Sequence, residues 1–290
     1  MSDIAGPTVR VSHGSGKWFP KEPKELRALV DSCMGEANVP CILGDIVGAI
    51  APHAGFQYSG PVAGHTFRAI QKNADHSGAP DLAVVIGFSH RSEFHGIALM
   101  DGDGLETPLG IATLDKEAAR QLSQGNRLIE MNYTPHIDEH SAENQIPFMQ
   151  ATIPRAKYVV ALVGDKRGDT VDSLVDGLLG LSATRKVLVV ASTDMLHDPS
   201  HELVSATDRD TLVQMETMDE IGLMERWSPA FQVCCGISPV ATMMRYSRAM
   251  GCNRGHILHY RNSGDDFPES RGQWVVGYAS AVFSTETKAA

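Results

Sequence analysis

Short apolar runs alternate along this chain with longer segments in which apolar residues recur at helical spacing. The runs are rich in Val, Ile and Ala and have the length of strands. Because they contain almost no polar residue, they are typical of strands covered on both faces, as in a parallel sheet. Strands are predicted at 46–50, 82–86, 158–163, 186–192, 255–260 and 274–283, and helices at 23–34, 116–124, 141–151, 170–181, 239–250 and within a polar region at 199–227.

Strands that alternate with helices indicate an α/β fold. We expect a single domain over residues 1–290, with a mostly parallel or mixed central sheet and helices on both faces. Segments 95–100 and 109–113 are predicted to form an antiparallel extension of that sheet.

Local signals suggest where some helices begin. Pro61 is expected in the first turn of the helix that follows residue 55, with Ser59 or Gly60 as its cap. Asp115 is expected to cap the helix at 116–124, and Ser141 the helix at 141–151.

The composition narrows the class of protein. The chain has 290 residues, of which 42% are hydrophobic and 21% charged, as in ordinary globular proteins. A core of this size needs no metal for stability, so a bound metal would be functional. The net charge of -10 and the lack of a basic stripe argue against nucleic-acid binding. Five cysteines without a CxxC pair indicate reduced thiols.

No apolar run is long enough for a membrane-spanning helix, so membrane insertion is not expected. The N-terminus also lacks the charged-then-apolar pattern of a signal peptide. We therefore expect a cytoplasmic protein.

Three predicted strands lead directly into loops that carry histidine or aspartate. The carboxyl ends of parallel strands meet at one edge of a sheet, where ligands bind in α/β proteins. Each histidine alone is equally typical of a structural or solvated loop residue, but together they predict a metal site or an acid–base site. The side chains are His53 after strand 46–50, His90 after strand 82–86, and Asp194 and His197 after strand 187–191.

Two further segments carry candidate chemistry. His140 and Glu143 are three residues apart and would share one face of a helix, where they could bind metal or orient a proton transfer. Acids at a helix N-terminus are the structural alternative. Cys235 precedes a glycine turn and a predicted helix start, an environment that lowers a thiol pKa. One member of the adjacent pair Cys234 and Cys235 is expected to be a buried apolar residue, which is the usual role of a free cysteine.

Together these segments resemble the Memo family, which is related in fold to the class III extradiol ring-cleavage dioxygenases. The matches occur in order along nearly the whole chain, which makes the resemblance specific. They are GKWFP at 16–20, APHAGFQYSG at 51–60, IGFSH at 86–90, ETPLG at 106–110, DEHSAE at 138–143, LVG at 162–164, STDMLH at 192–197 and CGISP at 235–239.

The resemblance implies a metal site formed by His53, His90 and Cys235. The two histidines match the metal-binding pair of the dioxygenases, and Cys235 takes the place of their glutamate. His140, Asp194 and His197 match polar residues of the same pocket, and we assign them catalytic roles. A thiolate in place of a carboxylate favours copper over the iron of the dioxygenases, although imidazole ligands suit iron, copper and zinc.

Two functions follow from this resemblance. The first is an iron- or copper-dependent redox enzyme acting on a small molecule, in which His197 is the general acid or base and Asp194 or His140 orients it. The second is a non-enzymatic module that binds a peptide or protein, or sequesters a metal, in signalling. A zinc hydrolase lacks support, because no HExxH-like spacing is present.

Overall fold

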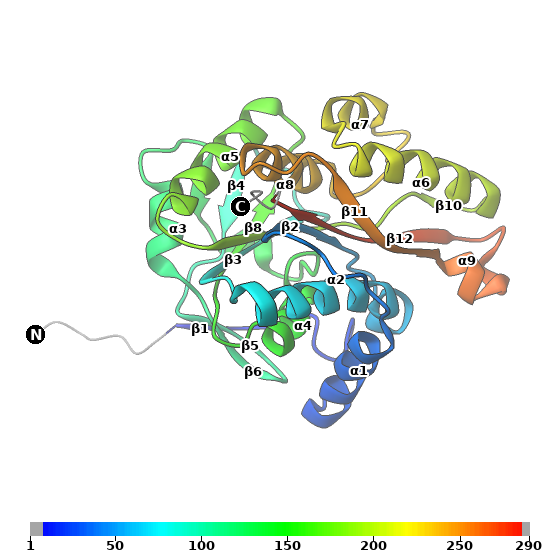
Figure 1. Ribbon diagram of the computed structural model, residues 1–290, viewed down its shortest axis with the longest axis horizontal. Coiled ribbons are helices and arrows are strands. Elements are labelled where there is room, and N and C mark those ends of the chain that lie inside the picture. Colours follow the sequence, from blue (N-terminus) through cyan, green and yellow to red (C-terminus); the bar gives the residue numbers. More distant parts are fainter. Residues whose placement is uncertain (1–7, 286–290) are drawn as a thin grey trace, which may run out of the picture.

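The computed structural model describes residues 8–285, which form a nine-stranded mixed sheet with helices on both faces (Figure 1). The strand order is β10-β12-β2-β9-β3-β8-β4-β7, with β11 paired to the other edge of β12. The strands of this sheet are β2 (Ile46–Ala51), β3 (Leu82–Phe88), β4 (Ile97–Leu99), β7 (Ile129–Met131), β8 (Lys157–Val163), β9 (Val187–Ser192), β10 (His197–Asp198), β11 (Gly255–Asn262) and β12 (Val275–Ser284).

The centre of the sheet is parallel. β2 pairs with β9, β9 with β3, and β3 with β8, all in the same direction. Every residue of β2 and β9 is buried, as their continuous apolar sequences predicted. The predicted α/β fold is therefore confirmed, with antiparallel strands added at the two sides.

Helices cover both faces because alternate residues of each strand point to opposite sides. In β3, Val84 and Ile86 belong to a core cluster with residues of α3, α5, α6, α7 and α8, whereas Ala83 and Val85 belong to a second cluster with residues of α1, α2 and α4. Figure 1 shows α5 to α8 above the sheet and α1, α2 and α4 below it. The helices are α1 (Pro23–Glu36), α2 (Phe56–Ser77), α3 (Lys116–Ser123), α4 (Ile146–Thr152), α5 (Gly168–Ser182), α6 (His201–Glu216), α7 (Glu220–Arg226), α8 (Ile237–Ala249) and α9 (Ser263–Asp266).

A second, three-stranded sheet lies beside the first and has the order β1-β5-β6. It consists of β1 (Val9–Val11), β5 (Gly104–Thr107) and β6 (Gly110–Thr113). The predicted antiparallel extension of the large sheet is confirmed for segment 95–100 and was wrong for segment 109–113. β4 pairs with β8 and β7 in the large sheet, whereas β6 pairs with β5 through a tight turn.

Two predicted helix starts were also wrong. α2 begins at Phe56, so Pro61 lies inside it, and Ser59 donates its hydroxyl to the carbonyl of Ala54 (2.8 Å) instead of capping it. Ser141 donates to the carbonyl of Phe88 (2.8 Å), and α4 begins only at Ile146 after a 3-10 turn. Asp115 does cap α3, where its side chain accepts from Ala118 N.

Within residues 8–285, no helix combines the length and the apolar composition needed to cross a membrane.

Candidate metal centre

The candidate site lies at the carboxyl ends of the three adjacent parallel strands β2, β9 and β3. His53 follows β2, Asp194 follows β9 and His90 follows β3. The rings of His53 and His90 are 5.2 Å apart between centroids, in an edge-to-face arrangement. The predicted convergence of these two loops is therefore confirmed.

His140 joins them as a third imidazole. Its ring lies 5.4 Å from that of His53 and 5.3 Å from that of His90, and one nitrogen from each of the three lies within 4.8 Å of the others. The three nitrogens could therefore hold a metal ion. His53 is buried, His140 half-buried and His90 exposed, so the cluster opens to solvent on the side of His90.

Ser192, the last residue of β9, determines which nitrogen of His53 faces the cluster. The hydroxyl proton of Ser192 goes to the carbonyl of Ser141 (2.5 Å), and its oxygen accepts from the amide of Gln145 (2.7 Å). His53 Nδ1 lies 3.0 Å from the same oxygen and must be the donor, because the hydroxyl has no second proton. Nε2 of His53 is thus left toward the centre.

Glu139 determines in the same way which nitrogen of His90 faces the cluster. One carboxylate oxygen of Glu139 lies 3.1 Å from His90 Nδ1 and also accepts from the backbone N–H groups of His140 and Ser141, both at 2.9 Å. The other accepts from the backbone N–H of His90 (2.7 Å). Burial raises the pKa of Glu139, but these hydrogen bonds and the nearby His90 outweigh it and hold the pKa well below its usual range. A carboxylate that orients a histidine in this way is typical of metal sites.

Hydrogen bonds to the Glu139 carboxylate therefore hold residues 139–141 in place, and these residues are not part of a helix. His140 and Glu143 do not share a helical face, because residues 140–142 precede the 3-10 turn Glu143–Gln145. Glu143 instead accepts hydrogen bonds from Ser12 Oγ (3.2 Å) and the backbone of His13 (3.1 Å). The glycine at position 87 makes room for this segment, because a Cβ there would meet Ser141 Oγ at 2.4 Å.

Trp18 holds the ring of His140. The two rings are stacked 3.9 Å apart and only 6° from parallel. Burial, together with the positive charge of His53, lowers the pKa of His140 to about 3, so its imidazole is neutral at pH 7. A neutral imidazole has a free nitrogen lone pair, as a metal ligand requires.

Cys235 borders the same centre. Its Sγ lies 3.3 Å from His53 Nε2 and accepts the backbone N–H of Asp194 (3.3 Å). Burial raises the pKa of this thiol, but attraction to His53 and hydrogen bonds with His53 and His90 outweigh it, so the pKa is well below the usual value. Burial raises the pKa of the adjacent Cys234, which packs into the apolar core as expected of one member of this pair.

His53 and His90 carry the complementary shift. Burial lowers the pKa of His53, but attraction to Cys235 and Asp194 raises it overall. Burial also lowers the pKa of His90, but hydrogen bonds with Cys235 and Glu139 outweigh this effect and raise the pKa to about 10. These opposite shifts favour a thiolate at Cys235 beside protonated imidazoles at His53 and His90, and a metal cation would take the place of those protons.

Asp194 mainly supports the His53 loop. One carboxylate oxygen accepts the backbone N–H groups of His53 (2.8 Å) and Ala54 (3.3 Å), and the other lies 3.9 Å from His53 Nε2. This explains how a charged group is tolerated at the end of an apolar strand.

His197 lies on the other side of Cys235. It starts β10 and lines a pocket of about 320 Å³ together with Cys235, Gln232 and Trp274. Its Nε2 is buried with no hydrogen-bond partner among the described residues, and its ring meets Trp274 edge to face at 5.9 Å. The structure thus places His197 in a pocket with Cys235 but outside the group of three histidines.

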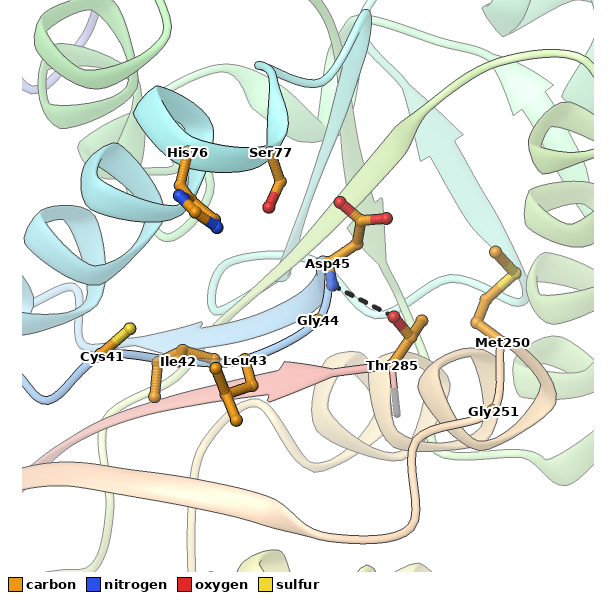
Figure 2. A pocket seen from close by; sticks show the side chains of 10 residues that line it. All are labelled: Cys41, Ile42, Leu43, Gly44, Asp45, His76, Ser77, Met250, Gly251 and Thr285. Atoms are coloured by element: carbon orange, nitrogen blue, oxygen red, sulfur yellow. Dashed lines mark hydrogen bonds between the residues drawn. The ribbon is translucent and has the colours of Figure 1, made fainter. Parts of the chain in front are cut away.

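A wider pocket of about 790 Å³ lies at the opposite end of β2, between the ends of α2 and α8 (Figure 2). Its lining contains none of the residues of the candidate site. Its one carboxylate, Asp45, is already paired with Lys186 (2.7 Å), and the backbone N–H of Asp45 donates to Thr285 Oγ1 (3.1 Å). The chemistry of this protein is therefore expected at the histidine end of the sheet.

The donor set of the candidate site fits a transition metal. Imidazole suits zinc, copper and iron, and a thiolate adds preference for softer ions. Sequence reasoning did not assign roles to Glu139, Ser192 or Trp18, although all three lie within the family-like segments. The family-like segments were the only feature of the sequence that pointed to these three residues. Their hydrogen bonds and stacking depend on residues far away in the chain, which the sequence pattern does not show.

Comparisons with known proteins identify the family of this chain. The family model described as Memo-like protein matches residues 10–282. A MEMO1 family protein of Methanopyrus kandleri is 31% identical over 285 residues, which cover 93% of this chain and 96% of the relative. Relatives with the same family name are 30% identical in Methanothermobacter thermautotrophicus and 31% identical in Methanobrevibacter smithii, and each alignment covers more than nine-tenths of both chains. The chain therefore belongs to the Memo family.

Proposed function

We propose that this Memo-family protein binds one iron or copper ion through His53, His90 and Cys235 and takes part in redox chemistry. The observation that carries the proposal is the preset orientation of the ligands. Ser192 and Glu139 occupy the Nδ1 atoms of the two histidines, and Nε2 of His53 lies 3.3 Å from the thiolate sulfur of Cys235. A buried cysteine that only packs as an apolar residue does not require oriented histidines around its sulfur.

His140 offers a further nitrogen. It belongs to the geometric cluster, and its pKa of about 3 leaves it neutral. We assigned it an orienting role in catalysis, and its position also suits a fourth ligand. Mutation of His140 distinguishes the two roles, because loss of a ligand lowers metal affinity whereas loss of an orienting group lowers turnover.

Within this proposal, His197 is the general acid or base. The pocket that it shares with Cys235 is large enough for a small molecule or one side chain of a peptide. The support for this role is that His197 lines the pocket and that its buried Nε2 has no hydrogen-bond partner among the described residues. Asp194 maintains the His53 loop. A bound iron or copper ion would supply the change in oxidation state that these side chains cannot.

A non-enzymatic binding module is the second candidate. It is favoured by the aromatic side chains exposed beside the site, since Tyr58 is 42%, Phe231 36% and Trp274 56% exposed. Exposed aromatic residues are typical of surfaces that bind peptides or proteins. In this case the metal would be held without turnover.

Elemental analysis of protein purified under reducing, chelator-free conditions tests the proposal first. We expect about one equivalent of iron or copper, and loss of that metal in Cys235→Ser and His53→Ala. Zinc in this site, or no metal, would contradict the proposed identity of the ion. Oxygen consumption after anaerobic loading then separates an enzyme from a binding module.

A further inference from the structure

Lys166 is held between two aromatic rings in the loop that follows β8. Its Nζ lies 4.3 Å from the centroid of the Phe88 ring and 4.4 Å from that of the Trp227 ring. The side chain is half-buried and forms no ion pair or hydrogen bond with any residue between 8 and 285. A lysine ammonium that gives up water without a carboxylate partner is unusual.

Of the two acids whose charges act on Lys166, Asp165 is engaged by other residues. The carboxylate of Asp165 accepts from the backbone of Gly96 (2.8 Å) and Arg167 (2.9 Å) and from Thr170 Oγ1 (3.1 Å). Burial lowers the pKa of Lys166, and the charges of Glu93 and Asp165 only partly oppose it. The two ring faces are therefore the main partners of the ammonium.

Each ring is connected to a different part of the candidate metal site. Phe88 ends β3, and its ring meets that of His90 edge to face at 5.8 Å. Trp227 follows α7 and donates its indole N–H to the carbonyl of Cys234 (3.2 Å), the residue before Cys235. Lys166 thus stands between the loop of His90 and the segment of Cys235.

A second contact joins the Lys166 loop to the segment of Cys235. Ser238, in the first turn of α8, donates its hydroxyl to the carbonyl of Asp165 (2.9 Å). The Lys166 loop is therefore already tied to the segment of Cys235 by a hydrogen bond. The contact with Phe88 extends this connection to the loop of His90.

We propose that Lys166 is a positioning residue of the metal site, which sets the separation of His90 and Cys235 by holding its ammonium between Phe88 and Trp227. The attraction of a cation to ring faces grows when both are desolvated. Methionine has a similar length but no charge, so Lys166→Met would release the two rings from each other. Arginine also binds ring faces and would preserve the connection.

The inference rests on the proposed function and is tested with Co²⁺, because a cobalt–thiolate charge-transfer band reports the bond to Cys235. Lys166→Met is expected to bind Co²⁺ about 10-fold more weakly than the natural protein, as is typical when groups around the ligands are changed. The thiolate band is expected to weaken or shift. Lys166→Arg is expected to stay within about 3-fold of the natural affinity, since both cations stack on aromatic rings.

Lys24→Met is the matched control, because Lys24 is an exposed lysine of α1. Thermal unfolding of each variant accompanies the titration. If Lys166→Met lowers only the melting temperature while affinity and band stay natural, or if Lys166→Arg loses as much affinity as Lys166→Met, the inference is wrong. Lys166→Gln replaces Lys166→Met should that variant not fold.

Hydrogen exchange of the metal-free protein gives a reading that does not depend on metal. Amides of residues 88–92 and 233–236 are expected to exchange faster in Lys166→Met than in Lys24→Met or Lys166→Arg. If the natural protein binds no Co²⁺, the titration says nothing about Lys166 and hydrogen exchange alone decides the inference, whereas elemental analysis for iron and copper still decides the proposed function. Equal exchange in all variants would overturn it whatever the metal result.

Discussion

Glu139 provides the sharpest test of how this site is built. Its carboxylate accepts four hydrogen bonds, three at one oxygen and one at the other. Glutamine has the same shape but only one accepting oxygen. In Glu139→Gln the amide oxygen is expected to take the position with three donors, which leaves the amide NH₂ facing the backbone N–H of His90.

We expect Glu139→Gln to lower both the stability of the fold and the affinity for metal. One charge-assisted hydrogen bond disappears and the remaining three weaken, so the free energy of unfolding is expected to fall by about 2–4 kcal/mol. His90 Nδ1 also loses a charged partner, and metal affinity is expected to fall by about 10–100-fold. That factor corresponds to about 1.4–2.8 kcal/mol of binding free energy.

The assay combines a chelator competition for Zn²⁺ or Co²⁺ at fixed pH with urea unfolding of the metal-free protein. Glu93→Gln is the matched control, because Glu93 is an exposed carboxylate in the same loop as His90. Natural metal affinity in a folded Glu139→Gln protein would show that the hydrogen bond to His90 does not orient the ligand. A loss of equal size in Glu93→Gln would show that the effect is only one of net charge.

Three further changes test other parts of the account. Burial lowers the pKa of His136 to about 4, so this group disfavours protonation in the folded state. Because the unfolded chain takes up that proton near pH 6.5, stability should be complete above 6.5 and fall by about 3 kcal/mol as the pH drops to 4. In urea unfolding at several pH values, His136→Gln should lack that part of the slope, and an unchanged slope would contradict the assignment. Cys235→Ser should weaken Cu⁺ more than Mn²⁺, because a hydroxyl is a harder ligand than a thiolate; equal losses in metal titrations would make Cys235 a core thiol only. His197→Ala should keep the fold and the metal yet lower any oxygen-dependent turnover by about 10²–10⁴-fold, and a variant that unfolds would show that His197 is structural.

The central strands were predictable because burial on both faces requires a continuous run of apolar residues. β9 and the centre of β3 contain only apolar and small residues, and their predicted ends differ from the observed ones by a residue or two. Helix starts were less predictable, because they depend on distant partners. Ser141 has the chemistry of a cap, yet its hydroxyl is taken by Phe88, more than fifty residues earlier in the chain.

The same distinction between predictable and unpredictable features holds for the candidate metal site. The sequence alone determined that His53, His90 and Asp194 would meet, because each follows a parallel strand and such strands end at one edge of the sheet. Only the tertiary structure decided which atoms face the centre. The proton of Ser192, the carboxylate of Glu139 and the ring of Trp18 settle the orientation of three histidines, and each acts through contacts with residues far away in sequence. Periodicity records which face of an element is buried, whereas hydrogen bonds depend on distances that exist only after the elements have packed.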